Sequence, residues 1–175
     1  MQGARVQAIC KRAKVNERML YEHFGDKRGL YEAVLRAQWL ALAKNWTLEI
    51  DETLSPYEGL CRAFGELARA LRTNPLFVRL SVHEALTGWR HAPRATLDAI
   101  PAPIRRIHAR GVKSGAFRRD VTFETIYFAV VGAVGWQTIF GDRFADVKRA
   151  RARDREFVEQ QATATIALIL RGAQP

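Results

Sequence analysis

The chain has 175 residues, with 28 Lys and Arg against 18 Asp and Glu and a formal net charge of +10 at pH 7. This length allows one large domain or a small domain followed by a medium one, and 48% hydrophobic residues suffice for a buried core. The excess of positive charge suits a polyanionic partner, above all nucleic acid.

The sequence does not favour export or membrane insertion. Its first residues lack the apolar segment of a signal peptide. Residues 125–140 carry no charge, but they are shorter than the roughly 20 residues of a membrane span. Cys10 and Cys61 lie in apolar helical surroundings, as reduced thiols of intracellular proteins do. We therefore expect a cytoplasmic protein that has no membrane partner.

Residues 4–23 predict two short helices joined by a tight turn. Apolar side chains repeat at helical spacing in the first helix, residues 4–13: Val6, Ile9, Cys10 and Ala13. Asn16 is a good N-cap for the second helix, residues 17–23, and Gly25 can end it with a left-handed conformation. In the second helix we expect three inward side chains: Met19, Leu20 and Phe24. A helix-turn-helix presents its recognition helix to the DNA major groove in this way.

A third helix is predicted directly after this turn, over residues 26–50. Asp26 can cap it, and Lys27 then lies in its first turn. Like charge disfavours a lysine at a helix N-terminus. A nearby phosphate would remove that penalty because helix N-termini bind anions.

The remaining sequence predicts further helices and no alternating strand pattern. Ser55-Pro56 and Asn74-Pro75 both resemble helix starts, with a cap followed by proline at the first helical position. Residues 87–93 are a break, and Pro101 and Pro103 demand a kink or a short loop. The predicted helices are 55–73, 74–86, 94–114, 122–140 and 151–171. The fold class expected is therefore all-α.

One run of residues resembles a known family signature. The run is Ile9, Lys11-Arg12-Ala13, Val15, Leu20-Tyr21, His23-Phe24, Asp26-Lys27, Leu30 and Val34. It resembles the DNA-binding signature of the TetR family of bacterial transcriptional regulators. The resemblance implies a helix-turn-helix domain over residues 1–30 and a helical ligand-binding and dimerisation domain over residues 31–175. It also implies that DNA contacts come from Asn16, Glu17, Arg18, Tyr21, His23 and Lys27.

Three features depart from that family. The family has an amphipathic first helix before the helix-turn-helix, so we expect the natural reading frame to extend upstream of Met1 by about one helix. The turn is Lys14-Val15-Asn16 where the family usually has Gly-Val-Ser, and lysine adopts a left-handed conformation less easily than glycine does. Glu17 places a carboxylate on the recognition helix, where it can accept a hydrogen bond from the N4 amine of cytosine.

The last two helices are candidates for a dimer interface. Small residues on one face of helix 122–140 allow close helix approach, and helix 151–171 is apolar on more than one face, which requires more than one partner. The alternative is that both helices complete a monomeric core. In the resembled family these helices pair with their symmetry mates in a four-helix bundle. The interface residues predicted are Ala129, Gly132, Ala133, Trp136, Phe157, Gln161, Ala164 and Leu168.

A ligand pocket is predicted among the aromatic residues of the body. Aromatic and apolar side chains with a few polar groups to orient a ligand are the usual lining of such sites. The candidates are Phe64, Leu67, His83, Leu86, Trp89, Tyr127, Phe128, Trp136 and Gln137. For any one of these aromatic residues, a place in the plain core is the alternative.

No motif supports catalysis, a metal or a cofactor. The four histidines are widely separated, and His83-Glu84 lacks the second histidine that the zinc-protease pattern requires. The function that the resemblance implies is a homodimeric, ligand-responsive repressor, released from a palindromic operator in double-stranded DNA by a small molecule. Two other interpretations stay open: a helical ligand-binding module without DNA function, and a helical enzyme.

Overall fold

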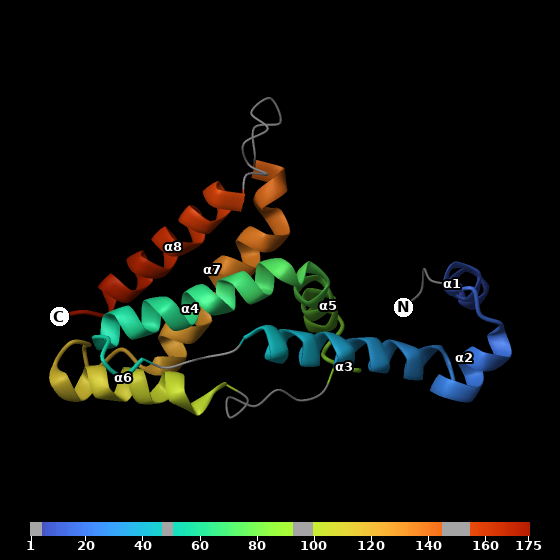
Figure 1. The fold of residues 1–175 in the computed structure, drawn as a ribbon, viewed down its shortest axis with the longest axis horizontal. Coiled ribbons are helices and arrows are strands. Elements are labelled where there is room, and N and C mark those ends of the chain that lie inside the picture. Colours follow the sequence, from blue (N-terminus) through green and yellow to red (C-terminus); the bar gives the residue numbers. More distant parts are fainter. Residues whose placement is uncertain (1–4, 47–50, 93–99, 145–154) are drawn as a thin grey trace.

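The computed structural model describes residues 5–46, 51–92, 100–144 and 155–175 (Figure 1). All the regular structure of these residues is helical, which confirms the all-α prediction. The helices are α1 (Val6–Ala13), α2 (Glu17–Phe24), α3 (Lys27–Asn45), α4 (Pro56–Thr73), α5 (Pro75–Leu86), α6 (Ala102–Ser114), α7 (Phe123–Phe144) and α8 (Arg155–Gly172).

Three predicted boundaries need correction. The helix predicted over residues 26–50 ends at Asn45, with Trp46 as its C-cap. The helix predicted over residues 122–140 continues past Gly141 to Phe144. A single glycine disfavours a helix by only about 1 kcal/mol, which packing of α7 against α8 can offset. Asn74 was expected to cap α5. Its side-chain amide instead donates to the Ala70 carbonyl at 2.7 Å and so caps the end of α4.

Other helix ends follow the predicted local chemistry. The Ser55 hydroxyl accepts from the Glu58 amide, and the Glu58 carboxylate accepts from the Ser55 amide, so a capping box opens α4. Pro56 occupies the first helical position, where its missing N–H has no partner to lose. Gly115 ends α6 in the left-handed conformation with φ 78°. These local signals define where the helices of the body begin and end.

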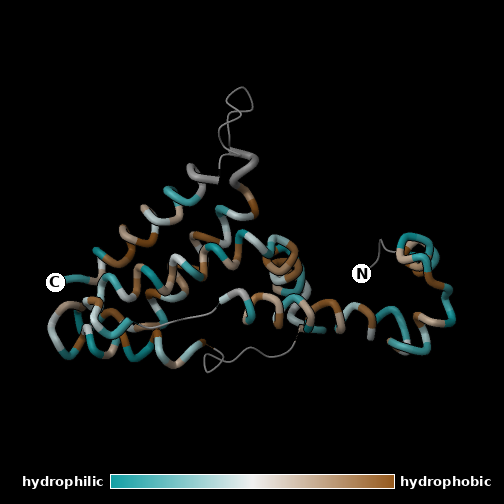
Figure 2. Tube along the Cα trace, in the orientation of Figure 1, coloured by the Kyte–Doolittle hydropathy of each residue, from teal (hydrophilic) through white to brown (hydrophobic). Residues whose placement is uncertain are grey.

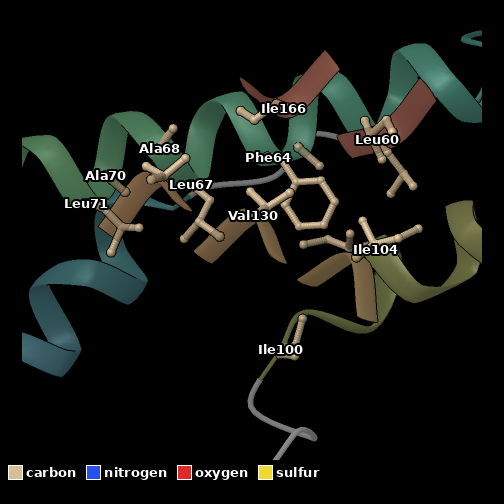
Figure 3. Close-up of a cluster of buried hydrophobic side chains, with 14 of the residues drawn as sticks. Leu60, Phe64, Leu67, Ala68, Ala70, Leu71, Ile100, Ile104, Val130 and Ile166 are labelled. Atoms are coloured by element: carbon tan, nitrogen blue, oxygen red, sulfur yellow. The ribbon is translucent and has the colours of Figure 1, made fainter. Parts of the chain in front are cut away.

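The core of the body forms around α4. Phe64 and Leu60 are completely buried, and side chains of α6, α7 and α8 meet them there, among them Ile104, Val130 and Ile166 (Figure 3). α7 and α8 also pack against each other. The body is therefore a helical bundle with α4 at its centre.

α3 connects the body to a small amino-terminal unit, which we call the head (α1, α2 and the first turn of α3). At 1.5 Å per residue its 19 residues extend about 28 Å. Its C-terminal half belongs to the body: Leu42 joins the core cluster, and the Trp39 ring meets Phe77 edge-on at 4.9 Å. The head lies at the other end of this helix, away from the core (Figure 1).

Candidate nucleic-acid interface

The turn between α1 and α2 is built on a lysine in a left-handed conformation. Lys14 has φ 55° and ψ 38°, as its place in the turn predicts. The Val15 amide donates to the Cys10 carbonyl at 3.1 Å, so the chain reverses within three residues of the end of α1. The Asn16 side chain accepts from the Met19 amide at 2.8 Å, which confirms the predicted N-cap of α2.

The head has only a small buried centre. Cys10 and Leu20 are its buried side chains on α1 and α2. Met19 and Phe24 were expected to point inward, but both are exposed. Two helices of eight residues offer too little surface to cover them. Within the described residues, α2 therefore buries mainly the Leu20 side chain.

The outer face of α2 carries the predicted DNA-contact side chains. The Arg18 side chain is 85% exposed and pairs with Glu22 at 2.7 Å one turn later. Such exposed pairs are weak, so a phosphate or a base edge can displace the carboxylate. Tyr21 and His23 are exposed, and Glu17 is half-buried. All these residues are on one short helix, together with its capping residue Asn16.

The junction of α2 and α3 brings a lysine to a helix N-terminus. The Asp26 side chain caps α3 by accepting from the Gly29 amide at 2.7 Å, and Lys27 follows in the first turn. A Cβ on Gly29 would collide with the Phe24 carbonyl oxygen, so glycine permits the close approach of the two helices. Figure 2 shows hydrophilic residues gathered at this junction. Residues 5–30 contain seven Lys or Arg against three Asp or Glu, which favours a polyanion at this face.

The predicted pocket residues do not share one surface. Phe64 and Leu67 are buried in the core, and Tyr127 and Gln137 are half-buried on α7. The other candidates are exposed: His83, Leu86, Trp89, Phe128 and Trp136. A hollow of about 610 Å³ lies elsewhere, at the end of α6 next to Arg118 and Pro175. The pocket therefore stays a prediction.

Most of the predicted dimer residues whose side chains the structure describes are exposed on α7 and α8. Ala129, Gly132 and Trp136 are exposed on α7, and Ala133 is half-buried. On α8, the predicted residues Gln161, Ala164 and Leu168 are exposed. Phe157 lies in the part of α8 whose side chains are outside the described residues. The opposite sides of both helices face the core through Val130, Val134, Ala162 and Ile166.

A buried carboxylate of the body was missed by the sequence analysis. Glu84 is 1% exposed and accepts hydrogen bonds from the Tyr31 hydroxyl and from the amides of His91 and Ala92. Burial alone would raise the pKa of Glu84, but the three hydrogen bonds outweigh it and lower the pKa. Burial and the bond to Glu84 raise the pKa of Tyr31 to about 12. The available signal was a lone carboxylate within the apolar helix of residues 75–86.

A buried histidine was missed as well. His108 stacks on Phe117 with ring centroids 5.8 Å apart, and its Nε2 lies 3.1 Å from the Val121 carbonyl oxygen. Because that oxygen can only accept, Nε2 carries a proton. Burial lowers the pKa of His108 and favours the neutral ring. No group of three or more His, Cys, Asp or Glu side chains is arranged to hold a metal within the described part of the chain.

These features define the class: an all-helical protein with a basic helix-turn-helix head at one end of a long connecting helix. Residues 1–34 match the family described as "Bacterial regulatory proteins, tetR family", and residues 56–169 match "Tetracyclin repressor-like, C-terminal domain". The second match alone spans more than half of the chain. This chain belongs to the tetR family of bacterial regulatory proteins, whose members are DNA-binding regulators and not enzymes.

A curated relative has a similar sequence over part of its length. The A-factor receptor protein of Streptomyces griseus is 29% identical to this chain over 111 residues. The matched region is 62% of this chain and 38% of the relative, so the chain spans well under two thirds of that protein.

Proposed function

We propose that this protein is a homodimeric, cytoplasmic transcriptional repressor that a small molecule releases from a palindromic operator. The observation that carries the proposal is the head: a capped recognition helix, α2, with an exposed polar face, followed by Lys27 in the first turn of α3. Two such heads would read half-sites separated by about one turn of DNA, roughly 34–36 Å.

The roles of the head residues follow from their chemistry and exposure. Tyr21 and Lys27 contact phosphates, which positions the head without reading sequence. Glu17 and Arg18 meet base edges, where arginine can bind guanine with two hydrogen bonds. Asn16 maintains the start of α2 through its bond to the Met19 amide, and His23 adds a contact at the other end of that helix.

An apolar surface on α7 and α8 supports dimerisation. The stretch Phe123–Phe140 is long and apolar enough to cross a membrane by length and composition alone, and only 22% of it is buried within one chain. Phe128 and Trp136 are each 60% exposed there. A Cβ at Gly132 would meet nothing within 4 Å, so a second helix has room to approach. Patches of this kind are typical of protein interfaces, and an isologous pairing of two copies would cover this one.

Ligand response is assigned to the body. The match of residues 56–169 to a tetracyclin repressor-like domain and the similarity to a protein named as a receptor both support a ligand-binding body. A ligand that binds one arrangement of the body better than another would shift the spacing of the two heads. Among the pocket candidates outside the core, Tyr127 packs against the core and Gln137 is half-buried.

A DNA titration tests the proposal. Binding should be measured on the DNA upstream of the protein's own gene and on random DNA of equal length, at several salt concentrations. Lys27→Ala should weaken binding to both DNAs and reduce the salt slope by about one per half-site. Arg18→Ala should instead lose mainly operator preference, by about 1–3 kcal/mol per half-site. If both variants bind like the wild type, the docking of α2 is wrong; if the wild type binds neither DNA, the chain is a ligand-binding module without DNA function.

A mass measurement tests the dimer. Gly132→Arg should give a monomer or an aggregate, because a long charged side chain would replace open space at the proposed interface. Gly65→Arg is the matched control, because Gly65 is also a helical glycine with no atom within 4 Å of its Cβ, but it lies on α4. A wild-type mass of one chain at micromolar concentration would refute the dimer.

A further inference from the structure

A buried carboxylate joins three segments where α3 meets the body. Oε1 of Glu84, in the last turn of α5, accepts from the Tyr31 hydroxyl of α3 at 2.9 Å. Oε2 accepts from the amides of His91 and Ala92 at 2.9 and 3.0 Å. Both oxygens are therefore engaged, one by the helix that carries the head and the other by the connection after α5. Hydrogen bonds to an ionised group are among the strongest in proteins.

Side chains around this bond add contacts between α3 and the segment that follows α5. The Tyr31 ring meets the His91 ring edge-on at 5.6 Å. His91 Nδ1 lies 3.6 Å from Glu32 on α3, and Glu32 also accepts from Arg28 at 2.9 Å. Arg28, Tyr31 and Glu32 belong to the first two turns of α3, so the contacts are concentrated next to the head.

The segment after α5, residues 87–92, is strained at Trp89. Trp89 has φ 55°, a left-handed conformation that bulky residues rarely adopt. Its amide donates to the Glu84 carbonyl at 2.7 Å, so Glu84 holds the connection through its backbone as well as through its side chain. A strained segment with several of its hydrogen bonds on one residue is suited to adopt a second arrangement when those bonds break.

We propose that Tyr31 and Glu84 are positioning residues for DNA recognition, an inference that rests on the function proposed above. Tyr31 lies four residues after Lys27, about one helical turn or 6 Å along α3. Because α3 runs without interruption from the head into the body, the head turns only if α3 pivots, and the Tyr31–Glu84 bond opposes that motion. Movement of residues 87–92 would release the bond and alter the direction in which α3 carries the recognition helix.

Removing one hydroxyl tests the proposal with little effect on packing. Tyr31→Phe keeps the ring and deletes the bond to Glu84. Tyr57→Phe is the matched control, because it deletes the same hydroxyl from a partly buried ring on α4 that is not a partner of Glu84. Operator and random DNA affinities should be compared at one salt concentration. Tyr31→Phe should lower the ratio of the two affinities by about fivefold or more, the range of measured couplings between sites, and Tyr57→Phe should leave it unchanged.

A distance measurement gives a readout that does not depend on DNA. Spin labels at the exposed positions 12 and 69 would report the direction of the head relative to α4, in a protein whose own two cysteines are replaced by alanine. Tyr31→Phe should broaden the distance distribution, and Glu84→Gln should broaden it in the same way. Glu84→Gln removes the charge and leaves one acceptor oxygen for three donors, so it weakens the bond to Tyr31. The double variant should be no broader than the broader single variant, since both substitutions act on one interaction.

The outcomes separate this inference from the proposed function. If the distance distribution and the affinity ratio of Tyr31→Phe both equal those of the wild type, even with lowered stability, the bond is purely structural and the inference is overturned. If the wild type binds no DNA, the proposed function fails, and the distance distribution still decides whether Tyr31 and Glu84 orient the head. Should Glu84→Gln fail to fold, Tyr31→Phe and its control carry the test.

Discussion

Replacing Lys14 by glycine should stabilise the head. A side chain in the left-handed region disfavours the folded state by about 1–2 kcal/mol, and Lys14 has φ 55° with its side chain exposed. Glycine removes that penalty but gives the unfolded chain more freedom, which offsets about 0.4–1 kcal/mol. Because the exposed lysine side chain contributes little packing, the net gain expected is about 0.5–1 kcal/mol.

Native-state amide exchange of α1 and α2 measures this gain directly, because it reports the free energy of local opening. Lys14→Ala is the control for charge, since it removes the ammonium group and keeps the strained Cβ, so it should give no gain. Lys11→Gly is the control for helix propensity. It places the same substitution inside α1, where glycine should destabilise the head by about 1 kcal/mol. If Lys14→Gly and Lys11→Gly change the opening free energy in the same direction, the left-handed turn is not the source of the strain.

Two further predictions concern the body. Gly111→Ala should lower the free energy of unfolding by about 1–3 kcal/mol, because its Cβ would enter the Phe117 ring that stacks on His108. Gly65→Ala is the control: its Cβ has open space around it, so it should stabilise the protein by up to about 1 kcal/mol. Equal denaturant midpoints for the two variants would contradict the packing described. Acid should destabilise the body in two steps, because the pKa values of His108 and Glu84 are both lowered in the folded state. The unfolded chain binds a proton at His108 below about pH 6.5 and at Glu84 below about pH 4.3, before the folded chain does. Unfolding free energies measured from pH 7 to about pH 3 should therefore fall, and His108→Phe should remove the upper step only.

Helix boundaries were predictable where the signal is local. Asn16, Asp26 and Ser55 each cap a helix that begins at the next residue, and each accepts from an amide three residues later. The left-handed Lys14 follows from its place in a tight turn. Asn74 shows the limit of such signals, because the same side chain can reach back to the Ala70 carbonyl and end the preceding helix.

Tertiary contacts were less predictable because they join residues distant in sequence. Tyr31 and Glu84 are 53 residues apart, and the local sequence around either residue does not indicate its partner. Periodicity does identify which side of α7 and α8 is apolar, but it does not say whether the chain or a second copy covers that side. Met19 and Phe24 have the spacing of buried residues, and their burial depends on how much surface the rest of the head supplies.

The mass of the protein–DNA complex tests the central claim most directly. The claim is that two heads, joined through α7 and α8 of their bodies, bind one operator together. Sedimentation of the wild type with DNA from upstream of its own gene should give two chains per duplex, and Gly132→Arg should abolish this complex while Gly65→Arg preserves it. A complex with a single chain per duplex, or one whose formation is unaffected by Gly132→Arg, would contradict the account.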